Sequence, residues 1–132
     1  MAMSERQSLD LWRRAVSSYV RTSELDLSAR QQAIFMTIAL QNGPHTVRGL
    51  AAGLNLAKPA VTRAVDMLEK AGFVRRRRDE NDMRSIFVER TTKGMDWLRN
   101  FSGLIVAAGA GEDISQIQTG NETEARPEPK AA

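Results

Sequence analysis

The spacing of apolar residues changes from helical to strand-like within residues 54–94, LNLAKPAVTRAVDMLEKAGFVRRRRDENDMRSIFVERTTKG, and this change indicates the fold. Residues 58–71 have helical spacing, and Pro59 fits only in the first turn of such a helix. Gly72 can adopt the left-handed conformation that follows a helix. Two strand-like runs, residues 73–78 and 84–90, then flank the charged tip at residues 79–82. The stretch predicts a helix followed by a β-hairpin.

Two further helices are predicted immediately before this stretch. Ser28 and Gln31 form a capping box, in which each side chain satisfies a backbone donor at the start of a helix. This helix runs to about residue 41 and is too apolar for a surface helix, so we expect it at the centre of the core. A short helix over residues 47–52 is predicted to end at Gly53, with Thr46 available as its cap. Helix, tight turn, helix and hairpin are the elements of a winged helix-turn-helix.

The two ends of this region are predicted to be dimerisation helices. Residues 6–22 and residues 92–107 are amphipathic, and their apolar stripes exceed what one small domain can cover. We therefore expect a homodimer that forms through these helices. Trp12 and Trp97 lie on them, and we expect both to pack in the dimer core; lining an effector cavity is the alternative. The predicted fold class is mainly α with a small β-hairpin, a winged helix-turn-helix flanked by N- and C-terminal dimerisation helices.

Composition excludes several classes of function. The chain has 132 residues, no cysteine and a single histidine, His45, so disulfides, thiolate chemistry, zinc sites with several soft ligands and a Ser-His-Asp triad are not expected. The acids lack a paired-carboxylate spacing, and His45 is expected to be structural or solvent-facing. We predict no enzymatic activity, no metal and no cofactor. No apolar run is long enough to span a bilayer, so we expect a cytoplasmic, nucleoid-associated protein.

The charge is unevenly distributed. Residues 110–132 contain five acids and two bases, which leaves 17 bases and 11 acids, a net charge of +6, in residues 1–109. A basic body favours a polyanionic partner such as DNA, although many basic faces are merely solvated. We predict that residues 1–109 form the DNA-binding domain with its terminal helices, and that residues 110–132 form an acidic disordered tail.

Candidate DNA contacts lie on the predicted recognition helix and on the hairpin. A helix in the major groove presents residues of its N-terminal half to base edges. The candidates there are Lys58, Ala60, Thr62 and Arg63, and the alternative is that they are only solvated helix residues. In the run from Arg75 to Arg78, strand alternation sends two arginines to each side, and both sides cannot face DNA. We expect phosphate contact from this run, with Arg75 and Arg77 as the candidates, and a solvated strand face is the alternative.

The motifs of the predicted recognition helix and wing resemble those of the MarR (multiple antibiotic resistance regulator) family. The matching motifs are V-T-R at residues 61–63, D-x-L-E at 66–69, G-F-V at 72–74, D-x-R at 82–84 and T-x-K-G at 91–94. The resemblance implies a dimeric bacterial regulator with two recognition helices in successive major grooves, and Arg84 in the minor groove with Asp82 orienting it. Pairing of Arg84 with Asp79 or Asp82 alone is the alternative. The chain departs from the family pattern in having one helix after the wing where members have two, with Met83 and Arg90 where relatives often carry arginine and leucine.

Two classes of function follow from this reading. The first is a sequence-specific double-stranded DNA-binding transcription regulator that binds a pseudo-palindromic operator as a homodimer. The second is a winged-helix protein-interaction module that uses its basic face for an acidic partner. Lys58, Arg63 and Arg84 favour the first. The sequence leaves open whether a small-molecule effector exists.

Overall fold

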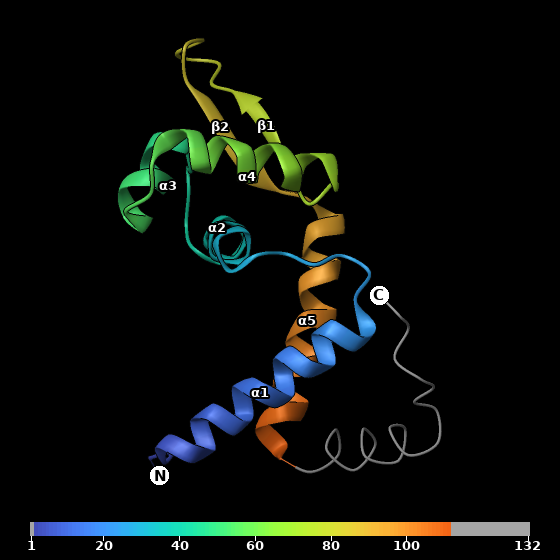
Figure 1. The fold of residues 1–132 in the computed structure, drawn as a ribbon. Coiled ribbons are helices and arrows are strands. Elements are labelled where there is room, and N and C mark those ends of the chain that lie inside the picture. The colour runs from blue at the N-terminus through green and yellow to red at the C-terminus, as the bar shows by residue number, and fades with distance from the viewer. Residues whose placement is uncertain (1, 112–132) are drawn as a thin grey trace, which may run out of the picture. The chain divides into compact units, whose positions relative to one another are not determined.

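The structure of this chain is a computed structural model, and it describes residues 2–111 (Figure 1). The predicted acidic tail, residues 110–132, lies outside the described residues except for its first two positions. The elements in chain order are α1 (Glu5–Thr22), α2 (Ala29–Leu40), α3 (Val47–Leu54), α4 (Lys58–Lys70), β1 (Val74–Arg78), β2 (Ile86–Arg90) and α5 (Thr92–Ala110). This mainly helical fold with one antiparallel hairpin confirms the predicted winged-helix class. No helix of the described chain is long and apolar enough to cross a membrane.

The described chain divides into two compact units: the first is Leu27–Arg99, and the second combines the residues up to Asp26 with those from Asn100 onward. The core of the first unit is built around α2, as predicted. Phe35 is fully buried and stacks on Phe73 with ring centroids 5.2 Å apart. Trp97 packs against both rings at 5.9 and 5.3 Å. Trp97 lies in the first turns of α5, which belong to this core, and packing of Trp12 and Trp97 in a dimer core stays a prediction.

The helix boundaries follow local chemistry. Both bonds of the Ser28–Gln31 capping box form, and the Thr46 hydroxyl accepts a bond from the Gly49 amide at 3.0 Å. The prediction that α3 ends at Gly53 is wrong: the helix continues to Leu54, and Asn55 ends it at φ 54°. Asparagine is one of the few residues other than glycine that adopts this left-handed conformation readily, because its short amide can bond locally.

The hairpin pairs β1 with β2 from Val74↔Arg90 to Arg78↔Ile86. His45 adds an isolated bridge, in which the Val88 amide donates to the His45 carbonyl at 2.8 Å. This gives His45 the structural role expected of it. The second strand begins at Ile86 rather than at Arg84, because the Arg84 and Ser85 amides bond to Asp82 and so belong to the tip.

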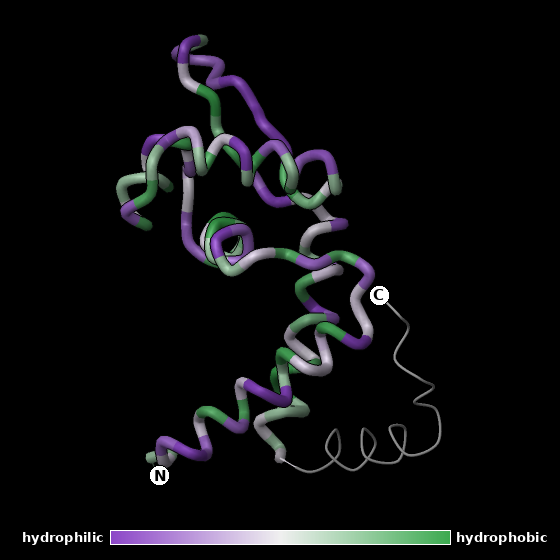
Figure 2. The backbone as a smooth tube through the Cα atoms, viewed as in Figure 1, coloured by the Kyte–Doolittle hydropathy of each residue, from purple (hydrophilic) through white to green (hydrophobic). Residues whose placement is uncertain are grey.

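The second unit pairs α1 with the C-terminal part of α5. Tyr19 meets Phe101 edge to face at 5.4 Å, and the Tyr19 hydroxyl donates to the Leu25 carbonyl. Apolar and polar residues alternate along α1 (Figure 2). One face of α1 is buried in this unit, whereas a second apolar stripe is exposed in the described chain; it consists of Leu9, Trp12, Val16 and Val20.

Candidate DNA-binding surface

The recognition helix α4 is held by its buried face. Val61, Val65 and Leu68 are fully buried, and they fix the rotation of the helix about its axis. Lys58 and Arg63 are consequently exposed, while Ala60 and Thr62 are half-buried. All four candidate residues of α4 thus lie off its core face, which is a requirement for reading DNA.

An open groove of about 730 Å³ separates the start of α4 from the wing. Four of its side chains are basic and one is acidic: Arg48, Lys58, Arg76 and Arg84, with Asp82. Thr46, Val47 and Thr62 are also part of its wall, with Ser85, Ile86 and Val88 from the wing. The structure therefore brings Lys58 and Thr62 together with Asp82 and Arg84 in one groove. It does not place Ala60, Arg63, Arg75 or Arg77 in the lining of this groove.

Arg75 and Arg77 lie on the side of β1 opposite to the groove, because they alternate with Arg76. Both guanidinium groups bind the same carboxylate, with Nε of Arg75 3.1 Å and Nε of Arg77 2.6 Å from the two oxygens of Glu89. The hydrogen bond from Arg77, with that from Arg75, lowers the pKa of Glu89 despite its partial desolvation. Arg77 also lies over the Phe87 ring, 5.1 Å from its centroid. DNA contact by Arg75 and Arg77 stays a prediction, and Glu89 competes with phosphate for both.

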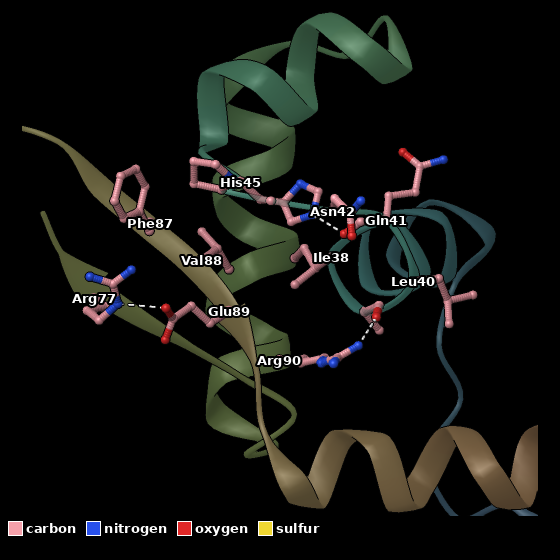
Figure 3. Close-up of a pocket in the computed structure, with 13 residues that line it drawn as sticks. Ile38, Leu40, Gln41, Asn42, His45, Arg77, Phe87, Val88, Glu89 and Arg90 are labelled. Atoms are coloured by element: carbon pink, nitrogen blue, oxygen red, sulfur yellow. Dashed lines mark hydrogen bonds and ion pairs between the residues drawn. The ribbon is translucent and has the colours of Figure 1, made fainter.

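Figure 3 shows the Arg77–Glu89 pair at the edge of a second, smaller hollow of about 260 Å³. The end of α2, the loop around His45 and the strand β2 line it. Arg90 closes one side, where its Nη1 donates to the Ala39 carbonyl at 2.5 Å. A cation at this position also interacts favourably with the negative end of the α2 dipole. Arg90 therefore ties β2 to α2, which an apolar residue could not do in this way.

Arg76 occupies the groove side of β1 and connects the wing to α4. Its Nη2 lies 2.7 Å from Asp66 Oδ1, and its Nη1 bonds Glu69 Oε1. The second Glu69 oxygen accepts the Arg76 backbone amide at 3.2 Å. Partial desolvation acts to lower the pKa of Arg76, but the two carboxylates raise it overall, so the group is permanently charged.

The wing tip is organised by Asp82. One carboxylate oxygen accepts the Arg84 amide at 3.1 Å, and the other accepts the Ser85 hydroxyl at 3.2 Å. These bonds, led by that from Arg84, lower the pKa of Asp82, so the tip bonds are present at neutral pH and are lost only as the pH falls through that lowered value. The Arg84 side chain is 94% exposed and only loosely paired, with Nε 3.5 Å from Asp82. Arg84 is thus available for an external anion.

Sequence reasoning missed Arg48 and Arg76 as groove residues. Arg48 lies in the first turn of α3, the helix that crosses the DNA backbone in helix-turn-helix proteins, so its position in the motif could have indicated it. The position of Arg76 could have been inferred from Val74. Residues two apart on a strand share a face, so Arg76 lies on the same side of β1 as the buried Val74.

A helix-turn-helix followed by a basic wing defines a winged-helix DNA-binding protein. Residues 27–86 match the sequence model of the MarR family. This match confirms the resemblance of the motifs: the winged-helix part of the chain is similar to the MarR family of transcription regulators.

Solved structures share the fold along most of the chain. A variant of S. aureus MepR bound to an oligodeoxyribonucleotide is 20% identical, with a TM-score of 0.64, and the match covers 90% of this chain and 89% of that one. CouR from Rhodococcus jostii RHA1 bound to p-coumaroyl-CoA is 22% identical, with a TM-score of 0.59 and coverage of 92% and 88%. A MarR-like regulator from Thermotoga maritima is 25% identical, with a TM-score of 0.56 and coverage of 95% and 94%. The search of curated proteins gave no match.

Proposed function

We propose that this regulator binds a pseudo-palindromic operator as a homodimer in the cytoplasm, associated with the nucleoid. Each protomer inserts α4 into the major groove and the tip of its wing into the adjacent minor groove. The observation that carries the proposal is the single groove that Lys58 and Thr62 of α4 share with the exposed Arg84 of the wing. Its excess of basic side chains suits a phosphate backbone. The DNA-bound MepR variant, which has the same fold, supports it further.

The dimer is supported by the second apolar stripe on α1. Leu9 and Val20 are each about 70% exposed and Trp12 is 51% exposed in the described chain. Contiguous apolar surface of this kind marks protein interfaces, and a second copy presents the same stripe for an isologous contact. Two copies related in this way present two recognition helices, which calls for half-sites about 10 base pairs apart.

The decisive test is selection of duplexes from a random-sequence pool. A regulator enriches one common sequence, and its affinity falls steeply with added salt, since phosphate contacts release counterions. An interaction module binds the pool without preference. Failure to enrich a common sequence would therefore refute specific DNA binding and leave the protein-interaction class.

Arg84→Ala should weaken binding to the selected duplex about tenfold, with the loss concentrated on sites that have A·T-rich flanks, because a narrow minor groove attracts an inserted cation. The measurement is a titration of duplexes that differ only in their flanks. Arg99→Ala is the matched control, because Arg99 is an exposed arginine on α5 that pairs with Asp96 and does not line the groove. Equal losses on A·T-rich and G·C-rich flanks would reduce Arg84 to a phosphate contact.

Arg63→Ala should have a different signature. Loss of a base-edge contact costs about 1–3 kcal/mol and relaxes the preference at one base position of each half-site. A repeat of the selection with the variant reads this directly. An unchanged consensus with uniformly weaker binding would assign Arg63 to phosphate instead.

A further inference from the structure

Arg76 is the side chain that binds the wing strand β1 to the recognition helix. Its guanidinium bonds two carboxylates one helical turn apart on α4, Asp66 and Glu69, and its own amide bonds Glu69 as well. The other paired arginines of the strand, Arg75 and Arg77, bind Glu89 of β2 and so act only within the hairpin. The hairpin is also anchored through Val88 to His45 and through Arg90 to α2, and Arg76 adds the side-chain link from β1 to α4.

The charges around Arg76 argue against a phosphate contact. One guanidinium meets two carboxylates, so the cluster Asp66–Glu69–Arg76 has a net charge of −1. The Arg76 side chain is 26% exposed, compared with 94% for Arg84. Turning Arg76 toward DNA would leave two unpaired carboxylates beside a polyanion. The pairing is therefore expected to persist when DNA binds.

We propose that Arg76 is a positioning residue for DNA recognition: by binding Asp66 and Glu69 it fixes the direction in which the wing leaves α4, and thereby places Arg84 against the DNA. This inference rests on the proposed DNA-binding function. It assigns Arg76, the second arginine of the run Arg75–Arg78, a role that differs from that of the exposed Arg84 at the tip and from that of the outward pair Arg75 and Arg77.

The test is a double-mutant cycle with Arg84→Ala, measured on the duplex that the wild-type protein enriches from a random pool. Arg76→Met keeps the apolar stem and removes the charge. It should weaken binding about fivefold, the range that a partly exposed ion-pair network supports. In the Arg84→Ala background the same change should have almost no effect, because there is no tip arginine left to place. Arg99→Met is the control on α5, and thermal melting checks that each variant is folded.

Glu69→Gln probes the cluster from the other side. If Arg76 positions the wing, this change loosens it and weakens binding; if Arg76 contacts phosphate, the change frees its charge and binding becomes tighter. Tighter binding by Glu69→Gln, or a fivefold loss by Arg76→Met that persists with Arg84→Ala, would overturn the proposal. An Arg76→Met variant that binds the selected duplex with unchanged affinity would overturn the proposal as well. A wild-type protein that enriches no sequence would instead sink the proposed function, and this inference with it.

Discussion

Trp12→Glu is expected to convert the dimer into a monomer and to weaken operator binding at least about hundredfold, since tethered half-sites gain about 10²–10⁴ in avidity. Trp12 lies in the middle of the exposed stripe on α1, with Leu9 and Val16 one turn away on either side. A carboxylate there must be desolvated in a symmetric interface, where it also meets its own copy or the partner's apolar side chains. Sedimentation at micromolar concentration reads the oligomeric state, and titration of the selected duplex reads the affinity.

Ser17→Glu is the control for Trp12→Glu. It adds the same charge to the same helix, away from the stripe, and should leave both readings near those of the wild type. Insertion of five base pairs between the half-sites should reproduce the loss with unmodified protein, because it turns the second half-site to the opposite face of the duplex. A Trp12→Glu variant that stays dimeric would show that the dimer interface lies elsewhere. Unchanged binding after the insertion would contradict the entry of two recognition helices into successive major grooves.

Gly94→Ala is expected to destabilise the winged-helix unit by about 2–3 kcal/mol, the upper part of the range for overpacking. A Cβ at this position would lie 2.3 Å from the Phe73 carbonyl oxygen and 3.0 Å from its carbon. These are backbone atoms whose positions are fixed by hydrogen bonds. Thr91 donates to the Gly72 and Phe73 carbonyls, and its hydroxyl accepts a bond from the Gly94 amide. The start of α5 would have to lift away from the strand. Thermal unfolding should show a midpoint lowered by about 10 °C.

Gly53→Ala serves as the matched comparison for Gly94→Ala in the same unit. Gly53 lies inside α3 with open space where its Cβ would be, so alanine should leave stability unchanged or raise it by up to about 1 kcal/mol. The same variant checks where α3 ends, because a glycine required as a helix terminator would not accept alanine. Loss of stability at Gly53 together with tolerance at Gly94 would contradict the packing described above.

The fold was predictable where one residue fixes one boundary. Ser28 with Gln31, Pro59 and Gly72 each satisfy a local backbone requirement, and each does so in the structure. The end of α3 was not predictable in this way, because Gly53 and Asn55 can both end a helix. Leu54 and Leu56 are half-buried in the unit, and packing of the chain beyond Gly53 decides between the two.

The site was predictable in part for a related reason. Lys58 and Thr62 follow from the order of elements, since the motif dictates where such residues lie, and Arg84 follows from the resemblance of the wing-tip motif. The roles of three of the four consecutive arginines depend on partners in other elements: Glu89 of β2 for Arg75 and Arg77, and α4 for Arg76. The paired residues lie 7 to 14 positions apart in the chain, and the local spacing of residue types does not show which of them meet. The position of Trp97 against Phe35 and Phe73 is non-local in the same sense.

Because the wing is attached at its base, its length can vary while the angle at which it leaves the domain stays the same. Val88 bonds His45 and Arg76 binds α4 near the base, whereas the tip is closed by its own aspartates, as in the bond from the Asn81 amide to Asp79. Residues gained or lost between Asp79 and Asp82 would alter how far the wing extends along the duplex and leave its angle of departure unchanged. A lineage of such regulators can therefore retune the distance to a flanking contact by changes in tip length alone, without redesigning the helix that reads the bases.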